Sequence, residues 1–313
     1  MERFFAESPE LIVNCEWEFK DLGEFPFEEV EQWPEAEAHQ GDKKNGRCYV
    51  NRIGGIDLEN SGAFVDGELH GVPYIHQLGI YAADGTADFI CVLFRTKRRM
   101  QLFMDELAFH LRGRTLQLFD FNLSYEYSFY RSWFPFVGMF FKDVKHPLKG
   151  YSHPTVANDA GCFEWRDAQA LFGPGGLAGA TKGLPHEKLS GDLDYSVARY
   201  PWSVLDDKEN EIRYPVFDAW GLCEAVYNFM QKNGSTNKKG VYVPLSQYGL
   251  KLTFTGLVRK DMNKILFPMR SDNKPITRHD CAACYDLICG AKRGGNTHSN
   301  MWFVADEVFE EEE

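Results

Sequence analysis

Three short polar stretches, separated by long gaps, constrain this chain more than any other feature of its sequence. They are Asp66-Gly-Glu68 within the apolar run Ala63 to Leu69, Asn122-Leu-Ser-Tyr-Glu126, and Tyr214-Pro-Val-Phe-Asp218. The first stretch predicts a strand, and residues two apart on a strand project from the same face, so Asp66 and Glu68 are expected side by side. Neighbouring carboxylates repel each other unless a cation lies between them. The pattern therefore predicts a site for a divalent metal ion.

The other two stretches supply further acids. Tyr214 and Asp218 are four residues apart ahead of an apolar helical run, and this spacing places a phenol and a carboxylate on one face of a helix. Glu126 adds a fourth carboxylate. Carboxylate oxygens suit Mg²⁺ and Mn²⁺.

In this order, acid-x-acid, Asn-x-x-aromatic-acid and Tyr-x-x-x-Asp, the stretches resemble the 3'–5' exonuclease domain of the DEDD superfamily in its tyrosine variant. The segment Ile75-His-Gln-Leu-Gly-Ile-Tyr81 is similar to the second strand of such domains. A narrower resemblance, to protein-primed family B DNA polymerases of phages and linear plasmids, comes from two more segments, Leu189-Ser-Gly-Asp-Leu-Asp-Tyr195 and Arg293-Gly294-Gly295-Asn-Thr-His298. In that family an aromatic-x-Gly-Gly motif joins the exonuclease to the polymerase.

The resemblance implies hydrolysis of a terminal phosphodiester with two divalent ions, Mg²⁺ or Mn²⁺. It implies that Asp66 bridges both ions, that Glu68 and Asp218 complete the site of the water-bearing ion, and that Glu126 supports the other ion. It also implies that Tyr214 holds the attacking water. These five residues are the expected catalytic set, and the four acids are the expected metal ligands.

The resemblance further implies contacts with single-stranded DNA. Asn122 and Tyr125 match positions that hold the frayed strand, where an amide and an aromatic face suit backbone and base. Arg293, Gly294 and Gly295 match the segment that contacts DNA between exonuclease and polymerase. The expected partners are single-stranded DNA 3' ends, together with a separate polymerase palm polypeptide or a terminal protein.

Four residues depart from the family pattern. Glu126 stands where the superfamily usually has Asp, which lengthens the ligand by one methylene. Pro215 directly follows the tyrosine and biases its predecessor away from helix, so the helix is expected to start or kink there. Ser190 occupies the place of a family lysine, with Lys188 nearby but out of register, and Phe121 replaces a histidine. The site is therefore expected to be altered in rate or substrate, or to be degenerate.

Composition and charge fit a globular chain that binds nucleic acid with its central part. The 313 residues are 44% hydrophobic and lack both a membrane-length apolar run and a signal peptide, so a cytoplasmic location is expected. The eight cysteines are expected to be reduced. The net charge is −12, but residues 1–40 hold 12 acids and 2 bases, and residues 306–313 hold 6 acids and no base. Of 46 acids and 34 bases, 28 and 32 therefore remain in the mildly basic central part.

The patterning predicts an α/β protein with an RNase H-like mixed sheet flanked by helices. Strands are expected at 62–69, 75–82, 88–94 and 115–121, with a turn at Asp84-Gly85 and a helix at 98–111. Residues 1–60 are expected to form an acidic, irregular extension, residues 61–232 the exonuclease domain, and residues 233–313 an incomplete linker and palm region.

Several other motifs have simpler interpretations. Glu16-Trp-Glu18 repeats the acid-x-acid spacing but lies in a strongly acidic region, and a surface position is expected. His279, Cys281, Cys284 and Cys289 suggest zinc, but without a second well-spaced ligand pair a helix that buries two thiols is the preferred interpretation. The glycine-rich residues 173–176 are expected to form a plain loop.

The sequence thus predicts the proofreading 3'–5' exonuclease part of a family B DNA polymerase. The chain contains no stretch that resembles the palm motif Asp-x-x-Ser-Leu-Tyr-Pro, so polymerisation is not expected of this chain alone. One alternative is a free-standing exonuclease for RNA or DNA. Another is a catalytically dead exonuclease fold that binds DNA or a polymerase partner.

Overall fold

A computed structural model describes residues 10–39, 46–65, 67–143, 146–153, 160–173, 175–190, 212–237 and 239–258. All of them belong to one compact unit that ends at Val258, whereas the sequence predicted a boundary after Lys232. Within these ranges, every helix is too short or too polar to cross a membrane.

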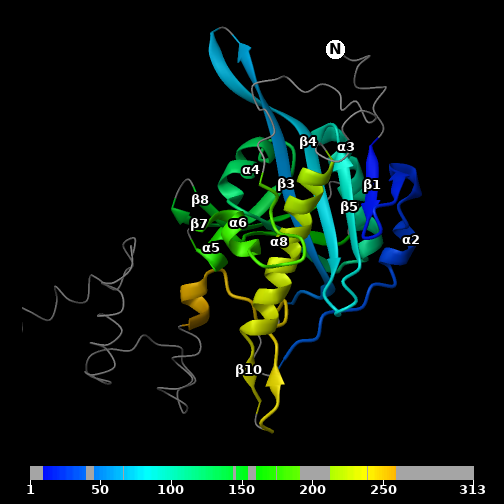
Figure 1. Ribbon diagram of the computed structural model, residues 1–313. Helices are drawn as coiled ribbons and strands as arrows, with labels where there is room; N and C mark the ends of the chain where they lie inside the picture. Colours follow the sequence, from blue (N-terminus) through cyan, green and yellow to red (C-terminus); the bar gives the residue numbers. More distant parts are fainter. Residues whose placement is uncertain are drawn as a thin grey trace, which may run out of the picture. The chain divides into compact units, whose positions relative to one another are not determined.

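A nine-stranded sheet, in the order β2-β1-β5-β4-β3-β6-β9-β8-β7, forms the centre of the fold (Figure 1). Its strands are β1 Leu11–Asn14, β2 Phe19–Asp21, β3 Tyr49–Val65, β4 Glu68–Ala82, β5 Phe89–Phe94, β6 Thr115–Asp120, β7 Phe136–Asp143, β8 His146–Ser152 and β9 Cys162–Asp167. The helices are η1 Leu22–Glu24, α2 Phe27–Val30, α3 Lys97–Leu111, α4 Leu123–Tyr130, α5 Gln169–Phe172, α6 Gly176–Thr181 and α8 Arg213–Lys232. A separate two-stranded sheet joins β10 Ser235–Thr236 to β11 Tyr242–Val243.

The sheet is mixed. β3 pairs with β6 and β6 with β9 in parallel, and the other neighbouring pairs are antiparallel. One face packs against apolar residues of α3 and α4, and the other packs against α8. Figure 1 shows α8 lying across the sheet. The predicted mixed α/β sheet flanked by helices is confirmed, and its layout is consistent with an RNase H-like fold.

The middle of the chain folds as its pattern predicts. Gly85 adopts a φ of +91° in the turn that joins β4 to β5, a conformation that glycine adopts at little cost. Thr96 caps α3, because its Oγ1 accepts a hydrogen bond of 3.2 Å from the Arg99 backbone N–H. The helical-period residues Met100, Phe103, Leu107 and Leu111 are all buried. The strands and helix predicted for residues 75–121 are therefore confirmed, although β4 begins at Glu68 and not at residue 75, and the other elements differ by one residue at one end.

The strand predicted at 62–69 is wrong, because the chain reverses direction inside it. Val65 of β3 pairs with Glu68 of β4 in antiparallel register. Gly67 has a φ of +84°, and Asp-Gly is a strong hairpin signal. β3 therefore lies mostly before this stretch, beginning at Tyr49, and the end of the β3–β4 hairpin extends past the rest of the sheet (Figure 1).

The N-terminal region is also more ordered than predicted. Within residues 1–60, β1, β2 and most of β3 belong to the main sheet, and β1 pairs with β5. Phe25 and Phe27 pack on Phe103 of α3, with ring centroids 4.7 and 5.1 Å away. This region is therefore part of the fold and not an irregular extension.

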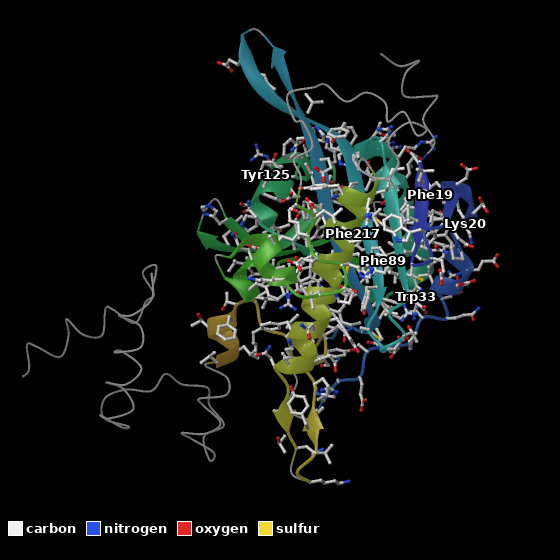
Figure 2. All side chains as sticks on the ribbon, viewed as in Figure 1. Phe19, Lys20, Trp33, Phe89, Tyr125 and Phe217 are labelled. Atoms are coloured by element: carbon white, nitrogen blue, oxygen red, sulfur yellow. The ribbon has the colours of Figure 1, made fainter. Side chains whose placement is uncertain are left out.

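Glycines allow α8 to lie close to the sheet. A Cβ atom at Gly55 of β3 would be 2.7 Å from the carbonyl oxygen of Ala219, and one at Gly79 of β4 would be 2.8 Å from the ring of Phe89. Phe89 of β5, which is labelled in Figure 2, in turn stacks on Trp220 of α8 with ring centroids 4.5 Å apart. The close approach brings the start of α8 directly over β3.

Pro215 neither starts nor kinks α8. The helix begins at Arg213, and Pro215 occupies its first turn, where backbone N–H groups have no partner within the helix. Proline is tolerated in that turn. Tyr214 and Asp218 therefore both belong to one regular helix, as their spacing requires.

Candidate metal centre

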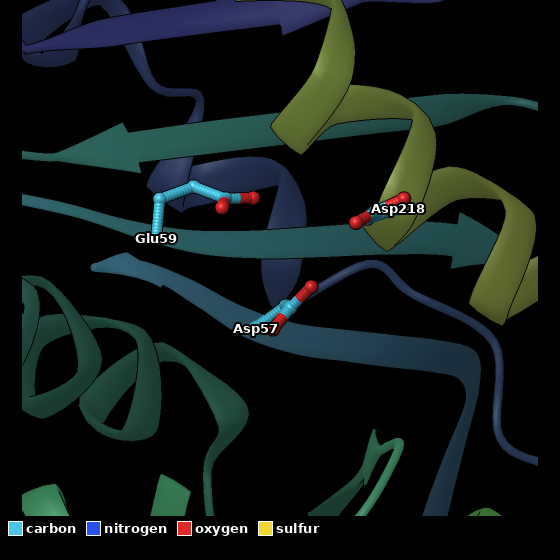
Figure 3. A group of neighbouring side chains, drawn as sticks. All are labelled: Asp57, Glu59 and Asp218. Atoms are coloured by element: carbon cyan, nitrogen blue, oxygen red, sulfur yellow. The ribbon is translucent and has the colours of Figure 1, made fainter. Parts of the chain in front are cut away.

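Three carboxylates from two elements meet over the centre of the sheet. Among the described residues, Asp57 and Glu59 of β3 and Asp218 of α8 each offer an oxygen within 4.8 Å of the others'. Figure 3 shows the three side chains directed toward one another. Glu59 and Asp218 are buried, and Asp57 is partly buried. Such convergence of acids in the interior is costly without a cation.

The alternation of β3 and the packing of α8 create this group. Ile56 and Leu58 point into the core beneath α3 and α4, so Asp57 and Glu59 face the other side, toward α8. Asp218 precedes Ala219, the residue that lies against Gly55. The glycine two positions before Asp57 therefore sets the distance between the two elements that carry the acids.

A second group of acids follows the carboxyl ends of the parallel strands. Asp120 ends β6, Asp167 ends β9, and Glu126 lies in the first turn of α4, which follows β6. Asp120 and Glu126 are buried, and this burial together with the Glu126 carboxyl raises the pKa of Asp120. Asp167 accepts backbone N–H groups of Asn122 at 3.3 Å and of Gln169 at 2.9 Å, so it also holds the β6–α4 connection in place.

The electrostatics join the two groups. Burial, together with the Asp218 carboxylate, raises the pKa of Asp57 to about 7. Burial and the charge of Asp57 raise the pKa of Glu126 to about 8. Burial also raises the pKa of Glu59, and burial and Glu126 raise that of Asp120. Asp57 thus interacts with acids of both groups.

These residues fit a divalent metal. One oxygen each of Asp120, Glu126 and Asp218 is buried without a hydrogen-bond partner. An unpaired buried carboxylate oxygen is unfavourable, and a metal ion would satisfy it. The donor set consists of carboxylate oxygens alone, which favours Mg²⁺ or Mn²⁺ over metals that prefer nitrogen or sulfur.

Within the described residues, the Lys188 ammonium is the cation that reaches the acids. The Lys188 ammonium forms an ion pair with Asp218 and lies 4.6 Å from the ring centroid of Tyr214. Although burial favours the neutral amine, Asp218 and Tyr214 raise the pKa of Lys188. Lys188 in turn opposes the effect of burial, which raises the pKa of Asp218. The lysine that seemed out of register in the sequence therefore lies beside the predicted Tyr-x-x-x-Asp residues.

The predicted DNA-binding residues of the second motif lie at the edge of the acid group. Asn122 has a φ of 87° and starts α4, a left-handed conformation that asparagine tolerates. Tyr125 is 46% exposed, its hydroxyl contacts Asn60 of β3, and its ring packs edge-on against Phe129 at 5.3 Å (Figure 2). Asn122 and Tyr125 are thus exposed beside the buried Glu126, where they are available to a ligand.

Two parts of the predicted site have different outcomes. Glu126, Asp218 and Tyr214 lie at or beside the acid group. Glu68 does not, because its side chain is 85% exposed at the end of the β3–β4 hairpin, 4.0 Å from His70. Asp66, Arg293, Gly294, Gly295 and the candidate zinc residues lie outside the described residues.

The acid pair that was missed from the sequence is Asp57-Leu-Glu59. It has the same acid-x-acid spacing and follows the apolar, glycine-containing stretch Ile53-Gly-Gly-Ile56, which is typical of a buried strand under a closely packed helix. Asp66-Gly67, in contrast, carries a turn signal. These two local signals favour Asp57 and Glu59 over Asp66 and Glu68.

Comparisons with known proteins give only distant likenesses. No family model and no curated protein sequence matches the chain. Among solved structures, the chain is similar to Phi29 DNA polymerase complexed with primer-template DNA and incoming nucleotide substrates, with 12% identity and a TM-score of 0.48. It is also similar to Phi29 DNA polymerase complexed with single-stranded DNA, with 11% identity and a TM-score of 0.47. Each match covers 69% of this chain and 35% of the polymerase chain, so this chain spans about a third of those proteins, and the likeness assigns no family to it.

Proposed function

We propose that this protein is a metal-dependent 3'–5' exonuclease that removes nucleotides from single-stranded DNA ends. The observation that carries the proposal is the convergence of the Asp57, Glu59 and Asp218 oxygens within 4.8 Å, beside further buried acids. The ordered motifs of the sequence support the same reaction class, with Asp57-Leu-Glu59 as the first motif. Two divalent ions in such a site supply an activated water and stabilise the leaving oxygen.

The residues have the following proposed roles. Asp57 faces both acid groups and would contact both ions. Glu59 and Asp218 would complete one ion site, and Glu126 would hold the other with Asp120 behind it. Tyr214 lies next to Lys188 on the same side of the site and would orient the attacking water.

Single-stranded DNA is the proposed substrate. Tyr125 offers an exposed aromatic face next to the acids, and Asn122 offers an exposed amide. Aromatic stacking contributes about 1–3 kcal/mol per base in proteins that bind single strands. Both residues are exposed in the same short segment as the buried Glu126, so we expect a 3' end that reaches the metal site to contact them.

The direct test is degradation of a 5'-labelled single-stranded DNA in Mg²⁺, Mn²⁺ or EDTA. Stepwise shortening from the 3' end is expected with either ion and not in EDTA. Asp57→Asn should abolish this activity, whereas Glu68→Gln, which changes the exposed hairpin acid of the same spacing, should keep it.

Three outcomes would count against the proposal. Metal-independent cleavage, or equal activity of Asp57→Asn and the parent protein, would exclude the proposed centre. Binding of the labelled strand without cleavage in either ion would favour the alternative of a degenerate exonuclease fold that binds DNA. A preference for an RNA strand of the same sequence would favour a ribonuclease.

We further propose that the exonuclease acts with a polymerase palm polypeptide, as the sequence resemblance implies. Addition of such a polypeptide should give template-dependent synthesis in which a mismatched 3' nucleotide is removed before extension. Asp57→Asn should extend a matched primer normally and leave the mismatch in place. If the Asp57→Asn protein removes the mismatched nucleotide as well as the parent protein does, this proposal is contradicted.

A further inference from the structure

The lysine of the candidate site lies at the end of residues 182–188, which have no regular secondary structure. We call residues 181–188, from the last residue of α6 to Lys188, the lysine segment. At its start, the Thr181 hydroxyl donates to the Leu177 carbonyl oxygen at 3.0 Å and accepts the Lys188 backbone N–H at 3.0 Å. This bond closes the segment on itself but does not fix it relative to α8. The position of the Lys188 ammonium therefore depends on what joins the segment to the helix.

His186 provides that connection. Its ring stacks on Trp220 of α8 with centroids 3.4 Å apart and planes 13° apart, and it meets Phe217 edge-on at 5.3 Å. Its Nδ1 lies 2.7 Å from Oε1 of Glu224, and its backbone N–H donates to Oε2 of the same carboxylate at 3.1 Å. One carboxylate thus holds both the ring and the main chain of a residue two positions before Lys188.

The helix surface under His186 is shaped for this contact. A Cβ atom at Gly221 would be 2.3 Å from the His186 carbonyl oxygen and 3.0 Å from Cγ2 of Thr181, too close to be accommodated without a shift. Glycine within a helix costs about 1 kcal/mol relative to alanine. The close approach of the lysine segment is a physical reason for this unfavourable residue in the middle of α8.

The same side of α8 carries the candidate site. Tyr214, Asp218 and Gly221 are spaced by four and three residues, so they follow one another along one face of the helix. Lys188 contacts the first two, and His186 rests on the third. A shift of the lysine segment along or away from this face would separate the ammonium from Asp218.

We propose that His186 is a positioning residue for the exonuclease reaction, which docks the lysine segment on Trp220, Gly221 and Glu224 and thereby holds Lys188 against Asp218 and Tyr214. This inference rests on the proposed function. His186 itself points toward α8 and its contacts lie away from the acid group, so its effect on the reaction passes entirely through Lys188.

A double-mutant cycle tests this claim, because residues that act through one another are not additive. His186→Ala, Lys188→Ala and the double variant are compared in single-turnover degradation of a labelled single strand with Mg²⁺. We expect His186→Ala to lower the cleavage rate by roughly 10-fold or more at unchanged DNA affinity, since about 1.4 kcal/mol of transition-state stabilisation corresponds to a factor of ten. The double variant should be no slower than Lys188→Ala. Glu187→Gln, on an exposed neighbour that bonds only within the segment, is the matched control and should retain the parent rate.

Two further measurements separate positioning from a general loss of structure. Hydrogen exchange at the Lys188 backbone N–H should accelerate in His186→Ala, while the amides of β3 and β6 stay protected. Gly221→Ala keeps every side chain of the contact and favours helix formation, so it should fold, yet it should lower the cleavage rate like His186→Ala.

The positioning role and the proposed function fail in different ways. Multiplicative losses in the double variant, or a parent-like rate in a folded His186→Ala or Gly221→Ala protein, would overturn the positioning role and leave the proposed exonuclease intact. A parent protein that releases no nucleotide with Mg²⁺ or Mn²⁺ would instead overturn the proposed function, and the positioning role with it.

Discussion

Replacement of Asp57 by asparagine should stabilise the metal-free protein at neutral and alkaline pH. Burial, with the charge of Asp218, raises the pKa of Asp57 to about 7 from an ordinary value of 3.8. Because each tenfold change in an equilibrium corresponds to about 1.4 kcal/mol, ionised Asp57 costs the folded state at most about 4 kcal/mol at pH 8. Asparagine keeps the shape of the aspartate side chain and removes its negative charge.

The sign of the pH dependence follows from the raised pKa. The folded state holds the Asp57 proton more tightly than the unfolded state, so the protonated acid favours folding. That contribution is complete below pH 4, falls as the pH rises, and is lost above pH 7. The stability advantage of Asp57→Asn should therefore grow between pH 4 and pH 7 and remain constant at higher pH.

Thermal unfolding, monitored by circular dichroism, measures this difference in stability between the variant and the parent. In EDTA at pH 8 the variant should unfold roughly 5–10 °C above the parent, as expected for a few kcal/mol in a domain of this size. In Mn²⁺ the difference between the variant and the parent should shrink, because an ion at 100 times its Kd adds about 2.7 kcal/mol to the stability of the parent, and the variant lacks a ligand. Glu68→Gln should show neither effect. An Asp57→Asn protein that is no more stable than the parent at pH 8 in EDTA would refute the reasoning.

Substitutions at three further positions test the geometry of the site. Glu126→Ala should greatly reduce the cleavage rate and alter the preference for Mn²⁺ over Mg²⁺, whereas Glu126→Asp should change both only modestly. If the alanine variant cleaves DNA as fast as the parent, the role of metal ligand would belong to Asp120. Gly55→Ala places a methyl group 2.7 Å from the Ala219 carbonyl oxygen. It should lower the free energy of unfolding in urea by roughly 1–3 kcal/mol and abolish Mn²⁺ binding. Unchanged stability would contradict the close packing of α8. Tyr125→Ala should weaken single-strand binding by about 1–3 kcal/mol in a fluorescence titration without affecting Mn²⁺ binding, and an unchanged affinity would exclude stacking at this position.

Local signals were sufficient to predict much of the fold. β5, α3 and β6 follow directly from periodicity and the Asp84-Gly85 turn, because each element buries the face that its own residues define. Tyr214 and Asp218 were predicted together for the same reason, since a helix fixes residues four apart. The sequence therefore predicts which residues share a face when they belong to a single helix or strand.

The choice among acid pairs depends on more than one element. Several pairs share the acid-x-acid spacing, among them Glu16-Trp-Glu18, Asp57-Leu-Glu59 and Asp66-Gly-Glu68. Asp57 and Glu59 lie under α8, and this position results from the close contact between Gly55 and Ala219, which are far apart in the sequence. The placement of Lys188 likewise depends on the contact of His186 with α8 and not on the position of Lys188 relative to a sequence motif. The positions of Asp57, Glu59 and Lys188 thus depend on packing between distant segments, whereas the error about the strand at 62–69 overlooked the local Asp66-Gly67 turn signal.

Charge balance favours two ions over one at this centre. Asp167 accepts two backbone N–H groups that partly offset its charge. The other five acids, Asp57, Glu59, Asp120, Glu126 and Asp218, interact with one another, and Lys188 is paired with one of them. Full ionisation would leave a net charge of about −4, which a buried site does not tolerate without counterions. One divalent ion would compensate half of that charge and leave some acids protonated, with raised pKa values. Two divalent ions would balance the negative charge of the acids. Two ions are also the number that the proposed hydrolysis of a terminal phosphodiester would use.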